Sequence, residues 1–129
     1  MKVKNEFPPN IDEIRMVFDL TGFNPVFTYK DVLYNPTGLS VPEDLMKHEE
    51  IHEKQQKLIG VKEWWRMYLT DEKFRLSQEA EAYREQYQFI KEKMNRKARL
   101  PILKELTNNL SSKLYGNLIN FNQAKELIK

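Results

Sequence analysis

The two histidines of the chain lie four residues apart in the stretch Lys47 to Gln56, KHEEIHEKQQ, and Glu49 directly follows the first. On an α-helix, residues four apart lie one turn above each other, so His48 and His52 can direct both imidazoles at one ion. A catalytic zinc ion takes three protein ligands and one water, whose proton a neighbouring carboxylate can accept. The H-E-x-x-H spacing therefore predicts two metal ligands, His48 and His52, and a general base, Glu49.

The same spacing also suits two histidines that make ordinary hydrogen bonds on a charged helix. Val41, Leu45 and Ile59 share the helix face of His48 and His52. We therefore expect the imidazoles to point into the protein, where unpaired histidines are costly. This expectation favours metal binding over a pair of surface histidines.

The third ligand must be a carboxylate, because the chain has no third histidine and no cysteine. Three glutamates between residues 75 and 87 compete: Glu79, Glu81 and Glu85. The apolar stripe of this segment recurs at steps of three and four and consists of Leu76, Ala80, Tyr83, Tyr87, Ile90 and Met94. At about 100° per residue, Glu79 lies about 60° from the stripe centre, Glu81 on the opposite side and Glu85 more than a right angle away. Glu79 is the predicted ligand, with a surface salt bridge as the alternative role.

Several elements are expected to position these residues. We expect a helix over residues 11–20 that ends near Gly22, and a β-hairpin over 26–35 that turns at Lys30 and Asp31. The edge of this hairpin is a candidate for binding an extended peptide substrate. The stretch from Ser40 to Glu43 has a capping-box pattern and predicts a helix that runs to Ile59 and ends before a glycine.

The second half of the chain reads as a series of helices. They are expected over 62–69, from Asp71 to about Met94, from Pro101 onward, and as one or two short helices in 111–129. In the last segment, the residues predicted to face inward are Leu114, Leu118, Ile119, Phe121, Leu127 and Ile128. Trp64 and Trp65 point about 100° apart on a helix, so we expect one to pack inward and the other to cover an apolar edge. The basic run over 91–99 is read as a solvated face.

Composition limits the classes of function. With 129 residues and 40% hydrophobic content, the chain is expected to form one domain, 1–129. The predicted fold class is α+β and predominantly helical, with the small hairpin packed on the helix of the histidines. Basic and acidic residues, 21 and 19, nearly cancel, which argues against nucleic acid or an anionic membrane as a partner. Since no apolar stretch has the length of a signal peptide or membrane span, the expected location is the cytoplasm.

The motif pair resembles the gluzincin class of zinc metallopeptidases, in which H-E-x-x-H on one helix is followed by a glutamate on a later one. Glu79 to Ala82, EAEA, is similar to the E-x-x-A pattern that some gluzincins carry. The resemblance implies that His48, His52 and Glu79 bind zinc and that Glu49 is the general base and acid. Gln55 and Gln56, the WW pair and the QEAEAYREQY segment also resemble small zincin-like proteins of bacteria and phages, over about 26–87.

One position departs from the gluzincin pattern. An acidic residue commonly follows the glutamate ligand by four positions and orients a histidine, whereas this chain has Tyr83 there. Tyr83 can accept an imidazole N–H or assist the substrate, but it also belongs to the apolar stripe, which we favour as its role.

The sequence thus predicts a zinc-dependent peptidase that acts on a peptide or protein. Its first rival is a non-catalytic zinc protein or degenerate zincin, in which the same residues bind metal for stability or for holding a peptide. The second rival is a metal-free helical interaction module. The oligomeric state stays open, and a His and carboxylate site also accepts nickel, cobalt or copper.

Overall fold

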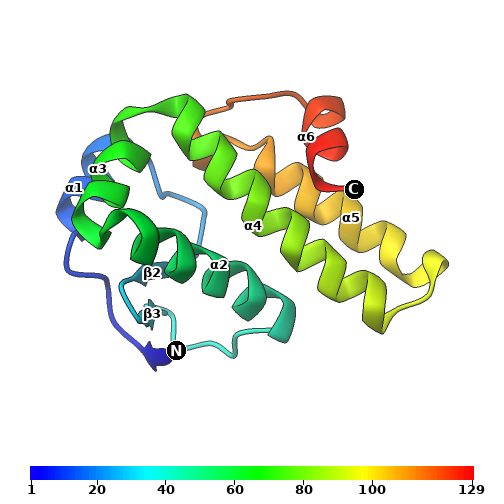
Figure 1. The fold of residues 1–129 in the computed structure, drawn as a ribbon, viewed down its shortest axis with the longest axis horizontal. Coiled ribbons are helices and arrows are strands. Elements are labelled where there is room, and N and C mark those ends of the chain that lie inside the picture. Colours follow the sequence, from blue (N-terminus) through cyan, green and yellow to red (C-terminus); the bar gives the residue numbers. More distant parts are fainter.

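The computed structural model describes residues 1–129 as six α-helices, a 3-10 helix and a three-stranded sheet (Figure 1). The elements follow in the order β1 (Lys2–Lys4), α1 (Ile11–Val17), β2 (Phe27–Tyr29), β3 (Val32–Tyr34), α2 (Glu43–Ile59), α3 (Val61–Thr70), α4 (Glu72–Lys93), α5 (Arg96–Leu110), η1 (Lys113–Tyr115) and α6 (Phe121–Ile128). This is the predominantly helical α+β fold that the sequence predicts. None of the helices is both long and apolar enough to cross a membrane.

The sheet has the strand order β1-β3-β2. The predicted hairpin is confirmed: β2 and β3 are antiparallel, Tyr29 lies opposite Val32, and Lys30 adopts a left-handed φ of 60° in the turn. The parallel pairing of β1 with β3 was not expected from the sequence. Because β1 has only three residues, all of them exposed, it is shorter than the runs of about four to eight residues that mark a strand in a sequence.

Helix α2 begins later than the capping box predicts. Its N-cap is Pro42 in an extended conformation, with ψ of 151°, and no side chain caps the helix. The predicted cap by Ser40 is wrong, because Ser40 lies two residues before the N-cap and its hydroxyl makes no bond with the first turn. Glu43 and Asp44 in the first turn instead favour the helix dipole. The predicted end is confirmed: Gly60, with φ of 100°, ends α2 and begins α3.

The boundaries of α1 and α4 differ slightly from the prediction. Helix α1 ends at Val17, because Phe18 is already extended with φ of −115°. Helix α4 begins as predicted after Asp71, whose side chain accepts a hydrogen bond from the Phe74 backbone N–H at 3.1 Å. Met94, predicted as the last member of the apolar stripe, is 39% exposed because α4 ends at Lys93.

Pro101 does not open α5. This helix begins at Arg96, capped by the Asn95 side chain, which accepts from the Ala98 N–H at 2.9 Å. Pro101 lies inside the helix on an exposed face, where water can bind the carbonyl that loses its helical donor. The N-cap at Asn95, and not Pro101, therefore determines where α5 begins.

The last segment forms η1 and α6, as the sequence predicts. Ile128 is buried and Leu114, Leu118, Ile119 and Leu127 are half-buried, but Phe121 is exposed. Helix α6 buries the face that carries Ala124 and Ile128, four residues apart, and Phe121 at its first position lies off the region they contact.

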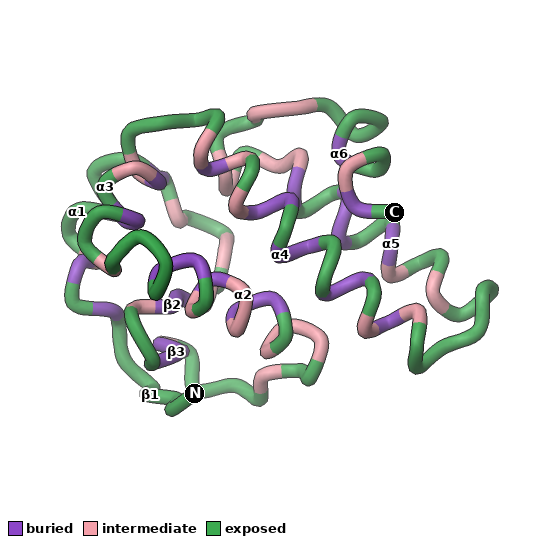
Figure 2. Tube along the Cα trace, viewed as in Figure 1, coloured by how far each residue is buried: buried purple, intermediate pink, exposed green.

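Two apolar clusters make up the core. The first joins α1, the hairpin and α3 and consists of Ile14, Phe18, Phe27, Val32, Tyr34, Trp64, Trp65 and Tyr68. The second joins α4, α5 and α6 and consists of Tyr83, Tyr87, Ile90, Leu103, Leu106, Leu110, Ala124 and Ile128. Helix α2 runs between the sheet and α4, and buried residues line the middle of both α2 and α4 (Figure 2). The buried residues of α2 are polar: His48, Glu49, His52, Gln55 and Gln56.

Both tryptophans are buried in the first cluster, so the prediction that one packs inward while the other covers an apolar edge is wrong. Their ring planes are nearly perpendicular, at 87°, in an edge-to-face contact. Trp65 packs within this cluster, and its buried indole N–H donates to the carbonyl of Thr28 at 3.2 Å.

Candidate metal centre

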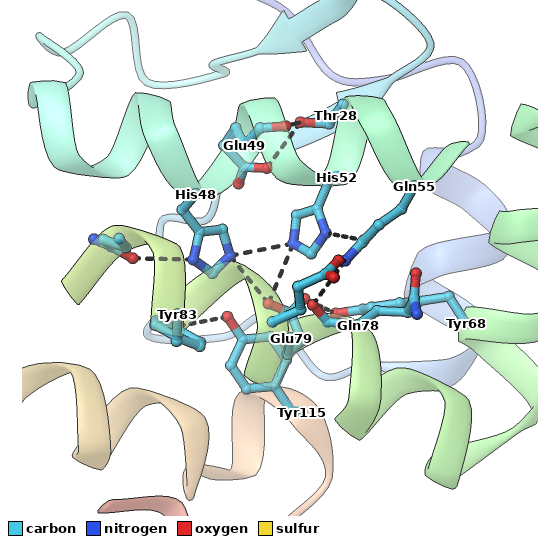
Figure 3. Close-up of polar contacts among 12 residues, drawn as sticks. Thr28, His48, Glu49, His52, Gln55, Tyr68, Gln78, Glu79, Tyr83 and Tyr115 are labelled. Atoms are coloured by element: carbon cyan, nitrogen blue, oxygen red, sulfur yellow. Dashed lines mark hydrogen bonds and ion pairs between the residues drawn. The ribbon is translucent and has the colours of Figure 1, made fainter. Parts of the chain in front are cut away.

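Helices α2 and α4 bring three potential ligand atoms together (Figure 3). Oε1 of Glu79 lies 3.0 Å from Nε2 of His48 and 3.2 Å from Nε2 of His52, and the two Nε2 atoms are 3.1 Å apart. The side chains are buried, with residue exposures of 3%, 4% and 4% for His48, His52 and Glu79. The inward orientation predicted for Glu79 is confirmed, while Glu81 and Glu85 are exposed. Ile59 is also exposed, because it lies two turns beyond His52 at the helix end.

A hydrogen-bond chain fixes the proton on His48. Gln86 donates its Nε2–H to the carboxylate of Asp44 at 2.8 Å, and a carboxylate only accepts. The amide oxygen of Gln86 must then face Nδ1 of His48, at 3.0 Å, and accept a hydrogen from it. Because Nδ1 carries the hydrogen, Nε2 of neutral His48 presents a lone pair towards Glu79.

A second chain of the same kind fixes His52. Gln55 donates its Nε2–H to the carbonyl of Gln78 at 3.1 Å and to the carboxylate of Glu81 at 2.8 Å. Its amide oxygen therefore accepts from Nδ1 of His52, at 2.8 Å. In neutral His52, Nε2 then also presents a lone pair, and a carboxylate-anchored glutamine orients each imidazole.

When both imidazoles are neutral, three acceptors thus converge with no hydrogen between them, an arrangement that needs either a proton on one imidazole or a bound metal cation. The pKa values reflect this demand. Burial lowers the pKa of His52, but the charge and hydrogen bond of Glu79 outweigh burial and raise the pKa to about 9. Burial likewise raises the pKa of Glu79, but His52 and His48 outweigh burial and bring it below the ordinary value.

The donor set fits a zinc ion. Two imidazole nitrogens and a carboxylate oxygen are the ligand types that catalytic zinc takes. With bonds of about 2.0 to 2.1 Å, ligands at the corners of a tetrahedron lie about 3.3 Å apart. The three separations among His48, His52 and Glu79, 3.0 to 3.2 Å, are close to that spacing.

Tyr68 holds the other oxygen of Glu79. Its hydroxyl donates to Oε2 at 2.5 Å, and burial, followed by the charge of Glu79, raises the pKa of Tyr68 well above its usual value. The hydroxyl is therefore a permanent donor. Sequence reasoning assigned Tyr68 no role in the site, and its only signal was the four-residue spacing from Trp64, on which its ring stacks.

Glu49 lies beside the three ligand atoms without being one of them. Thr28 of β2 donates its hydroxyl hydrogen to Oε2 of Glu49 at 2.8 Å. Burial raises the pKa of Glu49, against the opposing effect of the two nearby histidines. A carboxylate with a raised pKa accepts a proton more readily near neutral pH, which suits a general base.

Tyr83 has the core role that we favoured. Its ring lies edge-on to the imidazole of His48, with ring centres 4.4 Å apart, and its hydroxyl pairs with that of Tyr115 at 2.7 Å. The hydroxyl thus binds no imidazole nitrogen. The orienting role at His48 belongs to Gln86, three residues further along α4.

A pocket of about 70 Å³ opens beside the ligand atoms. It is lined by Glu49 and the three ligand residues, by Thr28, Trp64, Trp65 and Tyr68, by Ile14, Phe18, Leu20, Pro25, Val26 and Phe27 from the N-terminal region, and by Leu114 and Tyr115 of η1. This volume holds about two water molecules at their share in the liquid and is well below that of a drug-sized ligand site. The pocket therefore has room for water beside the ligand atoms, and a larger molecule would have to enter past the walls formed by the N-terminal region and η1.

Part of the outer edge of β2 is already occupied. The carbonyl of Thr28 accepts from the side-chain amide of Gln56 at 2.8 Å and from Trp65. The backbone N–H of Lys30 donates to the same Gln56 side chain at 2.7 Å. These two backbone groups are not free for a substrate strand, so the edge that the sequence suggested for peptide binding is limited to the region before them.

No family model, curated protein or solved structure matches this chain. A functional assignment therefore depends on the chemistry of the site itself.

Proposed function

We propose that the protein is a zinc-dependent metallopeptidase of gluzincin type, with His48, His52 and Glu79 as ligands. The observation that carries the proposal is the convergence of three buried lone-pair acceptors, two of them fixed by Gln86 and Gln55. A structural role for these residues needs no such arrangement, since apolar residues of similar volume would avoid its electrostatic cost.

When bound, zinc lowers the pKa of a coordinated water towards neutrality and polarises the substrate carbonyl. The protein groups then move the proton. Glu49 takes the proton from the water at the oxygen that Thr28 leaves free, and the water oxygen attacks the peptide carbonyl carbon. Glu49 then gives the proton to the leaving nitrogen as the C–N bond breaks. His48, His52 and Glu79 stay in place, because Gln86, Gln55 and Tyr68 hold their distal atoms.

Metal content tests the ligand set. Protein purified without a metal-affinity tag should contain one zinc per chain by plasma mass spectrometry, and His48→Ala and Glu79→Ala should lose it. Glu85→Ala is the matched control, because Glu85 is exposed on the same helix as Glu79 and makes no hydrogen bond with the site. Absence of metal after zinc is supplied would sink the proposal and favour a metal-free interaction module.

One observation favours the second candidate, a metal-binding protein without turnover. The pocket is small and Glu49 is buried, so a closed site that uses the ion only for stability is compatible with this geometry. The two candidates differ in hydrolysis. The peptidase cleaves an unstructured protein such as casein, and its activity is lost with a chelator and restored by zinc, whereas the structural site binds zinc without cleavage.

A further inference from the structure

The two oxygens of Glu79 have different surroundings. Oε1 faces the nitrogens of His48 and His52, at 3.0 and 3.2 Å, whereas Oε2 faces away from them and accepts the hydrogen bond from Tyr68 at 2.5 Å. The side chain of Glu79 is only 5% exposed, so water does not compete for Oε2. One oxygen is thus left for an ion and the other is taken by the protein.

The ring and the backbone carbonyl of Tyr68 are held by several contacts. Its ring stacks on Trp64, with ring centres 4.8 Å apart and an angle of 20°, and Trp65 contacts it edge-on. Trp64 is tied to α4 by a 2.8 Å hydrogen bond from its indole to Gln78, the residue before Glu79. The backbone carbonyl of Tyr68 accepts a hydrogen bond from Nε of Arg75 at 2.9 Å. Arg75 lies on α4, one turn before Glu79. The phenol therefore cannot follow a rotation of the carboxylate.

We infer that Tyr68 is a positioning residue that restricts Glu79 to binding the metal through one oxygen and so keeps the ion four-coordinate. The inference rests on the metal site of the proposed function. A carboxylate can bind a metal through one oxygen or two, and two-oxygen binding requires Oε2 to turn from Tyr68 towards the ion, which weakens this buried hydrogen bond. With one atom each from His48, His52 and Glu79, the fourth position of a tetrahedron stays open for water.

The test compares Tyr68→Phe with Tyr115→Phe. Both changes remove one phenolic oxygen from the wall of the same pocket, but the Tyr115 hydroxyl pairs with Tyr83 and does not touch Glu79. Each protein is loaded with cobalt(II), whose visible absorption is strong in four-coordinate sites and weak in five- or six-coordinate ones. Zinc affinity is measured in parallel by competition with a chromophoric chelator.

We expect strong visible absorption for the wild type and Tyr115→Phe, and clearly weaker absorption for Tyr68→Phe. Zinc affinity should fall about 10- to 100-fold in Tyr68→Phe alone, the usual effect of removing a group that orients a ligand. An unchanged cobalt spectrum and zinc affinity in Tyr68→Phe would overturn the inference.

X-ray absorption on the zinc-loaded wild type decides the question even if Tyr68→Phe does not fold. Four nitrogen and oxygen ligands at about 2.0 to 2.1 Å support the inference, whereas a fifth ligand from a two-oxygen carboxylate overturns it. Failure of the proposed function is recognised separately. A wild type that binds zinc in a four-coordinate site but cleaves no protein contradicts the peptidase and leaves the role of Tyr68 intact.

Discussion

Thr28 and Glu49 lie 21 residues apart in the chain and are joined by a hydrogen bond of 2.8 Å between the hydroxyl of Thr28 and Oε2 of Glu49. This bond links the hairpin to α2 at the carboxylate that we propose as the general base. It selects which oxygen of Glu49 is free to accept a proton, so the strand contributes to the proposed chemistry through a residue that carries no charge.

Replacement of Thr28 by valine keeps the shape of the side chain and removes only the donor. We expect zinc content to stay at one per chain and kcat to fall about tenfold, which corresponds to one hydrogen bond of about 1.4 kcal/mol. KM should change little, because Thr28 positions Glu49 and need not bind substrate. The measurement is kcat and KM on a fluorogenic peptide identified from cleaved casein. An equal loss of zinc and activity would show that Thr28 acts on the fold instead.

The change Glu49→Gln tests the general base directly. Glutamine has nearly the same shape and can still accept from Thr28, but it cannot take a proton from water. We expect zinc binding to be retained and hydrolysis to fall about 10²- to 10⁴-fold, the usual contribution of a positioned base. Zinc content and turnover are measured on the same preparation, and hydrolysis at the wild-type rate would contradict the role assigned to Glu49.

The change Gln86→Leu should weaken zinc binding about 10- to 100-fold, because His48 loses the acceptor that keeps the hydrogen on Nδ1. Gln88→Leu is the control, since Gln88 is exposed on the same helix and takes no part in the site. Nitrogen-15 NMR of the imidazoles should show a mixed tautomer for His48 in Gln86→Leu and a single one in the control. Equal zinc affinities for the two variants would remove Gln86 from the site.

Metal binding should raise the stability of the protein, because an assembled ligand set exists only in the folded state. Zinc at 100 times its Kd should add about 2.7 kcal/mol. For a chain of this size the melting temperature should then rise by roughly 10 °C. A chelator should reverse the shift in calorimetry, and His48→Ala should show no shift at all. A zinc-induced shift that persists in His48→Ala would place the ion elsewhere.

The sequence was sufficient for the parts of the site that depend on helical phase. His48 and His52 are four residues apart on one helix, and the position of Glu79 relative to the apolar stripe separates it from Glu81 and Glu85. The end of α2 was also predictable, since Gly60 supplies a backbone conformation that few other residues adopt.

The groups that orient the ligands were not predictable, because each depends on how two elements pack. Gln86 reaches His48 only because α4 lies along α2, and Tyr68 reaches Glu79 only because α3 folds back on α4. The spacing of these residues along their own helices carries no such information. Two residues of the sequence, Asn95 and Pro101, could each mark the start of α5. The helix begins after the Asn95 cap.

The arrangement of the ligands on α2 and α4 has a consequence for the chain as a whole. His52 and Glu79 are 27 positions apart in the chain, and the segment between them includes all of α3. An ion held by both residues closes this segment into a loop, as a disulfide bond does in proteins that contain cysteine. Its closure restricts the unfolded chain and raises the free energy of unfolding by loop entropy, in addition to the contacts described above. With a metal ion bound, the chain, which has no cysteine, would have a reversible cross-link that metal availability makes or removes.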